Sequence, residues 1–220
     1  MKLKVLENID INLPSDVIEL TQRLSAIGID SYIVGGAVRN FLLGYDFVDV
    51  DIYCRCSKEF FINKEIKDIE IDYEFDNVIL ATVFINDWIS FSQSISFNKD
   101  FEDDYMSRDY SINAIWYNLL EKKLLGFDKS FDDLKKNKLV LCNKSSMDGL
   151  KYLRGIRLSR TYGLENLNEF DYDRNFMDID TKFKALRLRN EVSKHDIKDL
   201  MKRNLLGTLV DKLREFDIYV

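Results

Sequence analysis

Two acidic residues at alternate positions are the feature of this sequence best suited to chemistry. Asp49 and Asp51 lie in the run 47–53, where apolar and acidic residues alternate. This period of two predicts a β-strand that carries both carboxylates on one face. Two carboxylates so placed can hold one divalent cation, or two cations about 4 Å apart as in metal-assisted phosphoryl transfer. An isolated Asp-x-Asp is more often the exposed polar face of an edge strand.

A pair of glycines precedes the acidic pair. Gly35 and Gly36 come directly after a β-rich run at 31–34 and before a helical pattern at 37–43. Backbone without side chains can approach a phosphate closely, and the helix N-terminus offers free N–H groups. Such glycines are also typical of a simple tight turn. The order, with the glycine turn first and the acidic pair shortly after it, favours phosphate binding.

A third group follows in the middle of the chain. Arg108 and Asp109 stand at the beginning of a helix predicted through about residue 120, and Asn113 comes one turn later. This spacing can direct a guanidinium, a carboxylate and an amide toward one ligand. An N-capping aspartate beside a solvated arginine accounts for the same residues.

Basic residues recur every three positions in a helix predicted at about 148–162. Lys151, Arg154 and Arg157 drift around the helix axis and form one slanted cationic stripe. A solvated helix face is an equally good interpretation of this stripe.

Composition excludes several classes of protein. The chain has 220 residues, 46% of them hydrophobic, with one proline and nine glycines, which is typical of a folded globular protein. No apolar run approaches the roughly 20 residues that cross a bilayer, and the acidic N-terminus is unlike a signal peptide. We therefore expect a soluble cytoplasmic protein. Three cysteines and one histidine are too few for a disulfide framework or a His-rich zinc site, so a metal must be held by carboxylates, which favour Mg²⁺.

Charge is unevenly distributed. The net charge is −6, and fifteen Lys and Arg against twelve Asp and Glu in 151–220 leave residues 1–150 strongly acidic. The C-terminal part is too weakly basic for tight non-specific binding to a long nucleic acid.

The surrounding patterns predict a sheet with helices against it. A first helix from about residue 15 has Asp16 and Glu19 placed as in a capping box. Two β-rich runs, 78–85 and 88–95, flank Asn86-Asp87 and predict a tight hairpin in a sheet of at least four strands. The remaining predictions are a turn-rich stretch at 126–137, a short apolar run at 139–142 and short helices between about 175 and 220.

Three blocks, in this order, resemble the head of a class II tRNA nucleotidyltransferase, the family of bacterial CCA-adding enzymes and bacterial poly(A) polymerases. YIVGGAVRN at 32–40, LLG at 42–44 and DVD at 49–51 resemble the family order Y-x-V-G-G-x-V-R-D, L-L-G, D-x-D. SRDYSINA at 107–114 resembles R-R-D-F-T-I-N-A. DGLKYLRGIR at 148–157 resembles E-D-x-L-R-x-L-R-A-I-R.

The resemblance implies an α+β fold, with a polymerase-β-like nucleotidyltransferase head over 1–135 that contains a mixed β-sheet. A helical neck-like domain follows over 136–220. Asp49 and Asp51 would be catalytic and hold two Mg²⁺ ions, with a nucleoside triphosphate, ATP or CTP, as substrate. The implied nucleotide-binding residues are Gly35, Gly36, Arg39, Arg108, Asp109, Asn113, Asp148, Lys151, Arg154 and Arg157.

Four residues depart from the family pattern. Asn40 replaces an aspartate and Ser107 an arginine. Lys151 replaces the arginine that reads the incoming base together with Asp148, and a lysine lacks the planar guanidinium fork. The family's third metal carboxylate lies on the strand after the hairpin, where Ser90 aligns. Family members continue through a body and tail, so we do not expect a complete CCA-adding enzyme acting alone.

Three hypotheses follow for the function. The first is a metal-dependent nucleotidyltransferase that extends an RNA 3′ end, with tRNA as the model acceptor. The second keeps the chemistry but moves the acceptor to a small molecule or a protein. The third is a weak or inactive head that binds nucleotide or RNA as a regulatory module. Exposed apolar positions in the neck-like helices predict a homodimer or a partner protein, and no membrane partner is expected.

Overall fold

The computed structural model describes residues 1–47, 49–64, 66–86, 89–144 and 149–166, together with 211, 214 and 217. The chain divides into two compact units, Met1–Lys135 and Lys136–Val220. In the described ranges, no helix is long and apolar enough to cross a membrane. Apart from residues 211, 214 and 217, the short helices predicted after residue 175 fall outside the described residues, so these helices and the homodimer or partner contact predicted through them stay predictions.

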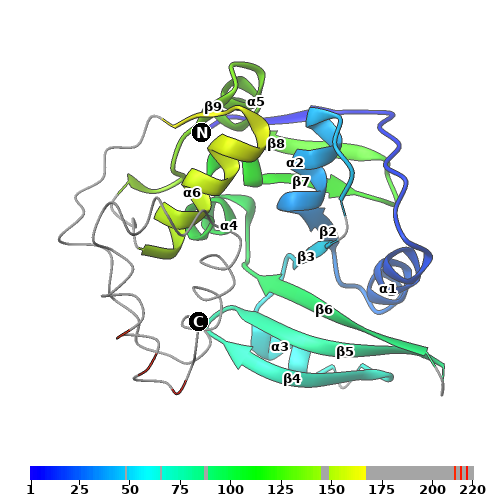
Figure 1. The fold of residues 1–220 in the computed structure, drawn as a ribbon. Coiled ribbons are helices and arrows are strands. Elements are labelled where there is room, and N and C mark those ends of the chain that lie inside the picture. The colour runs from blue at the N-terminus through cyan, green and yellow to red at the C-terminus, as the bar shows by residue number, and fades with distance from the viewer. Residues whose placement is uncertain are drawn as a thin grey trace. The chain divides into compact units, whose positions relative to one another are not determined.

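An eight-stranded mixed sheet forms the first unit, in the order β1-β8-β7-β2-β3-β6-β5-β4 (Figure 1). Neighbouring strands are antiparallel except β3 and β6, which run parallel. This arrangement confirms the predicted mixed sheet. The strands are β1 Leu3–Leu6, β2 Ser31–Val34, β3 Asp51–Cys54, β4 Ile69–Phe75, β5 Val78–Asn86, β6 Ile89–Phe97, β7 Ile115–Asn118 and β8 Lys123–Phe127.

Five helices accompany the sheet within the described part of the first unit. They are α1 Ser15–Ala26, α2 Gly36–Leu43, α3 Lys58–Ile62, α4 Phe101–Ser107 and α5 Asp128–Lys135, and a 3-10 turn spans Ser111–Asn113. An aromatic cluster fixes α4 against the sheet. The ring centroid of Phe101 on α4 lies 4.9 Å from that of Trp116 on β7 and 5.9 Å from that of Tyr53 on β3. This packing places the polar residues of α4 beside β3 and β6.

The second unit is described over its first part. Strand β9, Lys138–Leu139, pairs in parallel with β10, Glu165–Asn166. Between them lies α6, Gly149–Tyr162, which confirms the helix predicted near 148–162. Its residues Leu153 and Leu158 are fully buried.

Local patterns predicted the glycine turn and the hairpin correctly. Gly35 follows strand β2 directly, Gly36 is the first residue of α2, and α2 ends before Gly44, which is left-handed with φ 76°. Strands β5 and β6 form the predicted antiparallel hairpin, in which Asn86, predicted in the turn, is the last residue of β5 and pairs with Ile89.

Three local predictions were wrong. The helix predicted over 109–120 is the 3-10 turn followed by β7, because the β-prone residues Ile115 to Tyr117 pair with β2 and β8. The turn-rich stretch 126–137 contains the end of β8 and all of α5. The capping box is absent, since no side chain caps α1, Asp16 accepts from the N–H of Val17, and Glu19 pairs with Arg23.

Candidate active site

The two aspartates occupy different kinds of backbone. Asp51 is the first residue of β3, whereas Asp49 lies in the loop before it, so the prediction that both belong to one strand holds for Asp51 alone. Both residues are exposed to solvent. Their carboxylates are therefore accessible to a cation at the N-terminal end of β3.

Gly35 packs its backbone against the carboxylate of Asp51. Strands β2 and β3 pair Val34 with Asp51, which brings the glycine turn beside the beginning of β3. A Cβ on Gly35 would stand 3.0 Å from Oδ2 of Asp51, and Gly35 has φ 75° and ψ −134°. Both the close approach and the backbone conformation require glycine here. A Cβ on Gly36 would be 3.6 Å from Nη2 of Arg39, which is an ordinary contact.

A chain of hydrogen bonds joins the first predicted block to the second. Nη1 of Arg39 donates to Oδ1 of Asn113 at 2.6 Å, and Nδ2 of Asn113 donates to Oδ1 of Asp109 at 2.9 Å. The same carboxylate oxygen accepts from the backbone N–H of Tyr110 at 2.7 Å. All three side chains of this chain are buried. The structure thus brings together three of the predicted nucleotide-binding residues.

Hydrogen bonds of the Asn40 side chain explain why an amide stands at this position. Its Oδ1 accepts from Nη2 of Arg39 at 2.8 Å and from Nε at 3.1 Å. Its Nδ2 donates to the backbone carbonyl of Asp46 at 2.9 Å, which an aspartate could not do. Asn40 therefore connects Arg39 to the loop that leads toward Asp49.

Arg108 lies at the C-terminal end of α4, not at the beginning of a helix as predicted. Its Nε donates to Asp104 at 2.6 Å and its Nη2 donates to Asp104 at 3.0 Å and to Oγ of Ser96 at 3.2 Å. Burial lowers the pKa of Arg108, whereas the neighbouring carboxylates, Asp104 foremost, raise it, and the net direction is upward. Asp51 and Asp109 are also close enough to contribute. The guanidinium therefore stays charged close to Asp51.

The strand register identifies a serine next to Asp51. The parallel ladder pairs Ile52 with Ile95 and Tyr53 with Ser96, so one further step toward the strand beginnings sets Asp51 beside Ser94. Ser90 lies four residues away along β6, about 13 Å at the usual rise of a strand. The ladder thus favours Ser94 over the Ser90 of the sequence alignment. Among the described residues, no three His, Cys, Asp or Glu form a metal cluster.

The basic stripe belongs to the second unit. Lys151, Arg154 and Arg157 lie on α6 and are partly exposed. Asp148 lies outside the described residues, so its pairing with Lys151 in base recognition stays a prediction.

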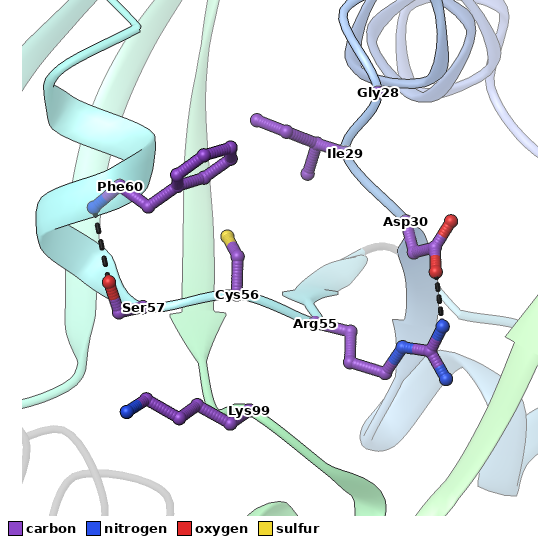
Figure 2. Close-up of a pocket in the computed structure, with 8 residues that line it drawn as sticks. All are labelled: Gly28, Ile29, Asp30, Arg55, Cys56, Ser57, Phe60 and Lys99. Carbon is purple, nitrogen blue, oxygen red and sulfur yellow. Dashed lines mark hydrogen bonds and ion pairs between the residues drawn. The ribbon is translucent and has the colours of Figure 1, made fainter.

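A cavity of about 400 Å³ lies at the C-terminal end of β3 and contains none of the predicted site residues. Figure 2 shows Arg55 directed toward Asp30, while Lys99 extends in the opposite direction. Burial raises the pKa of the Cys56 thiol to about 11. The lining residues are Gly28, Ile29, Asp30, Arg55, Cys56, Ser57, Phe60 and Lys99.

Asp104 is the site residue that sequence reasoning missed. It is completely buried and hydrogen-bonded to Arg108. In the sequence it belongs to the acidic run Glu102 to Asp104, a pattern typical of solvent-exposed charges. The available signal was its position four residues before Arg108 in a helix, the spacing of an intrahelical ion pair.

Comparison with known proteins decides the family. The poly A polymerase head domain matches residues 31–140, half of the chain. The chain belongs to this family. The match confirms the class II tRNA nucleotidyltransferase family that the three sequence blocks resembled.

Several curated relatives of this family member are CCA-adding or CC-adding enzymes. A CCA-adding enzyme of Streptococcus suis is 27% identical over 177 residues, covering 70% of this chain and 43% of the relative. One of Streptococcus mutans is 30% identical over 171 residues, covering 67% and 41%. A CC-adding tRNA nucleotidyltransferase of Shouchella clausii is 29% identical over 155 residues, covering 64% and 37%. The chain spans less than half the length of these relatives.

A solved structure supports the fold. The Thermotoga maritima CCA-adding enzyme complexed with tRNA-CCA superimposes with a TM-score of 0.62 at 20% identity, covering 91% of this chain and 54% of that chain. The fold is thus confirmed as α+β with a polymerase-β-like head.

Proposed function

We propose that this chain is a metal-dependent nucleotidyltransferase that binds ATP or CTP and transfers a nucleotidyl group to an RNA 3′ end, with a tRNA-like acceptor. The observation that carries the proposal is the close approach of the Gly35 backbone to Asp51. A Cβ added to Gly35 would lie only 3.0 Å from Oδ2 of Asp51. That arrangement would bring a phosphate bound at the glycine turn close to a cation bound by Asp51, which supports the proposal. Family membership supports the reaction class.

The residues present fit magnesium. Asp49 and Asp51 offer exposed carboxylate oxygens, the hard ligands that Mg²⁺ prefers, and the bare backbone at Gly35 leaves room on one side of Asp51. Bound magnesium would activate the attacking 3′-hydroxyl and neutralise charge on the phosphates.

The protein groups of the head would orient the triphosphate. The first N–H groups of α2 are free of helical partners and follow the glycine turn, where an anion is stabilised. Arg39, held by Asn40 and Asn113, and Arg108, held by Asp104, would bind phosphate or sugar oxygens. Positioning and electrostatics of this kind supply most of the catalysis in phosphoryl transfer, so no histidine or cysteine is required.

The acceptor and the base are assigned from the relatives. The relatives from Streptococcus are CCA-adding enzymes, and related structures are complexes with CTP, with ATP and with tRNA. On this basis tRNA is the first acceptor to test. Asp148 and Lys151 match the family's base-reading pair and would read the base, and Arg154 and Arg157 would bind the nucleotide.

The proposal is tested by incubating the purified chain with each α-labelled nucleoside triphosphate and Mg²⁺, with and without total tRNA. The expected result is label in RNA from CTP or ATP only when tRNA is present. A double variant, Asp49→Ala with Asp51→Ala, should abolish incorporation. Label on a protein or a small molecule instead of RNA would favour the second hypothesis, and nucleotide binding without any transfer would favour the regulatory module.

A further inference from the structure

Asp104 is a buried carboxylate with hydrogen bonds to both of its oxygens. Its exposure is 0%, and its two oxygens accept four hydrogen bonds. Oδ2 accepts from Nε of Arg108 at 2.6 Å and from Nε1 of Trp116 at 2.7 Å. Oδ1 accepts from Nη2 of Arg108 at 3.0 Å and from Nδ2 of Asn98 at 3.2 Å. Donors from α4, β7 and the end of β6 therefore fix the carboxylate in a single orientation.

This carboxylate in turn fixes the Arg108 guanidinium. The pair forms a two-pronged fork in which Nε and Nη2 face Asp104, the geometry that restricts a guanidinium most strongly. Nη2 also donates to Ser96. Within the described residues, no hydrogen bond occupies Nη1 of Arg108. The side chain is 14% exposed, so that nitrogen is the group's remaining donor for a ligand.

The fixed guanidinium lies near Asp51. Ser96 pairs with Tyr53 across the β3–β6 ladder, and Asp51 is two residues before Tyr53 on the same face of β3. Asp51 is also among the charges that act on Arg108. If Asp104 did not hold the guanidinium, Asp51 would be an available counter-charge, and an arginine bound there would compete with a cation.

We infer that Asp104 is a positioning residue that holds Arg108 off Asp51. Asp51 then keeps its oxygens for the metal ion, and Arg108 keeps Nη1 for a phosphate or sugar oxygen of the nucleotide. The inference rests on the proposed function, because it assigns a role in the same metal and nucleotide site. It goes beyond the proposed function in one respect: Asp104, which does not contact the substrate, determines the affinity of the site for the metal ion.

The test compares two aspartates of α4. Asp104→Asn keeps the shape of the side chain but removes its charge, and Asp103→Asn removes the same charge from an exposed position one residue earlier. Mn²⁺ binding is measured by water-proton relaxation, with thermal unfolding followed in parallel. We expect Asp104→Asn to bind Mn²⁺ about tenfold more weakly, the scale of one charge-assisted hydrogen bond, and Asp103→Asn to bind as the unmutated chain does.

A double variant separates positioning from general damage. Asp104→Asn combined with Arg108→Gln leaves no guanidinium to occupy Asp51, so Mn²⁺ affinity should return to that of the unmutated chain. Nucleotide affinity should stay weakened, because Nη1 is lost. A purely structural role of Asp104 would leave the double variant at least as impaired as the single one.

A milder variant covers the case in which Asp104→Asn unfolds. Asn98→Ala removes one anchor of Asp104 at a partly exposed position and should weaken Mn²⁺ binding two- to threefold, a few tenths of a kcal/mol. Folded variants with unchanged Mn²⁺ affinity would overturn the inference while leaving the proposed function intact. Failure of the unmutated chain to bind Mn²⁺ would overturn both.

Discussion

Nη1 of Arg39 donates a 2.6 Å hydrogen bond to Oδ1 of Asn113, which joins two segments 74 residues apart in the sequence. Asn113 in turn donates a hydrogen bond from its amide Nδ2 to Oδ1 of Asp109. The spacing of residues inside each block therefore accounts for only part of this arrangement. The other part is made by the sheet, in which β2 lies between β3 and β7.

Asn113→Ala should destabilise the head and weaken nucleotide binding. The variant leaves the buried Arg39 and Asp109 side chains each without one partner, at a cost of about 1–3 kcal/mol for the unmet groups. Urea unfolding followed by circular dichroism measures the loss. Asn118→Ala, at the partly exposed end of β7, is the control and should lie within about 1 kcal/mol of the unmutated chain.

Gly35→Ala should weaken nucleotide binding far more than Gly36→Ala. Alanine at position 35 combines a positive φ with a Cβ 3.0 Å from Asp51, and the backbone strain alone costs about 1–3 kcal/mol. Position 36 is helical and its Cβ would make an ordinary contact, so alanine there should be tolerated or slightly stabilising. Isothermal titration with CTP and ATP measures both. Equal affinities for the two variants would contradict the role of the glycine turn.

Ser94→Asp should add a third carboxylate to the metal site, whereas Ser90→Asp should not. The ladder sets position 94 beside Asp51 and leaves position 90 exposed farther along β6. In the metal-free protein the new charge repels Asp51, so the free energy of unfolding should fall, and added Mn²⁺ should restore it. Thermal melts with and without Mn²⁺ test the register, and a larger metal-dependent shift for Ser90→Asp would refute it.

Cys56 should react slowly at neutral pH. Burial raises the pKa of its thiol to about 11, so the reactive thiolate is scarce below that pH. Because the folded pKa lies above the unfolded one, neutral Cys56 favours the folded state below the unfolded pKa, and this contribution is lost as the pH rises toward 11. Alkylation rates by mass spectrometry between pH 7 and 11 should climb throughout the range. A plateau near pH 8 would contradict the shifted pKa.

Sequence patterns predicted those parts of the fold that neighbouring residues determine. The glycine turn before α2 and the β5–β6 hairpin depend on residues within a few positions of one another, and both predictions were confirmed. The segment Ile115 to Asn118 was predicted helical although β8 follows it closely in sequence, and its other pairing partner, β2, lies about eighty residues earlier. The spacing of apolar residues within a segment carries no information on which distant strand the segment will pair with.

The same limit applies to the candidate site. Arg39, Asp109 and Asn113 could be selected from their motifs, but their hydrogen bonds could not be predicted. Asp104 was missed because its burial results from packing of Phe101 and Trp116, not from its sequence neighbours. Ser94 could be distinguished from Ser90 only by the strand register.

Transfer of label to tRNA by an Asp51 variant is the most direct test of the account. The unmutated chain, Asp51→Asn and Asp46→Asn would each be incubated with α-labelled CTP or ATP, Mg²⁺ and tRNA. Asp46 is an exposed acid in the same loop whose side chain has no assigned role, so Asp46→Asn should transfer label at the unmutated rate. Asp51→Asn should lose at least about 99% of the rate, as expected when a metal-binding carboxylate is removed. Equal rates for the two variants would contradict the assignment of Asp51 and the proposed metal site.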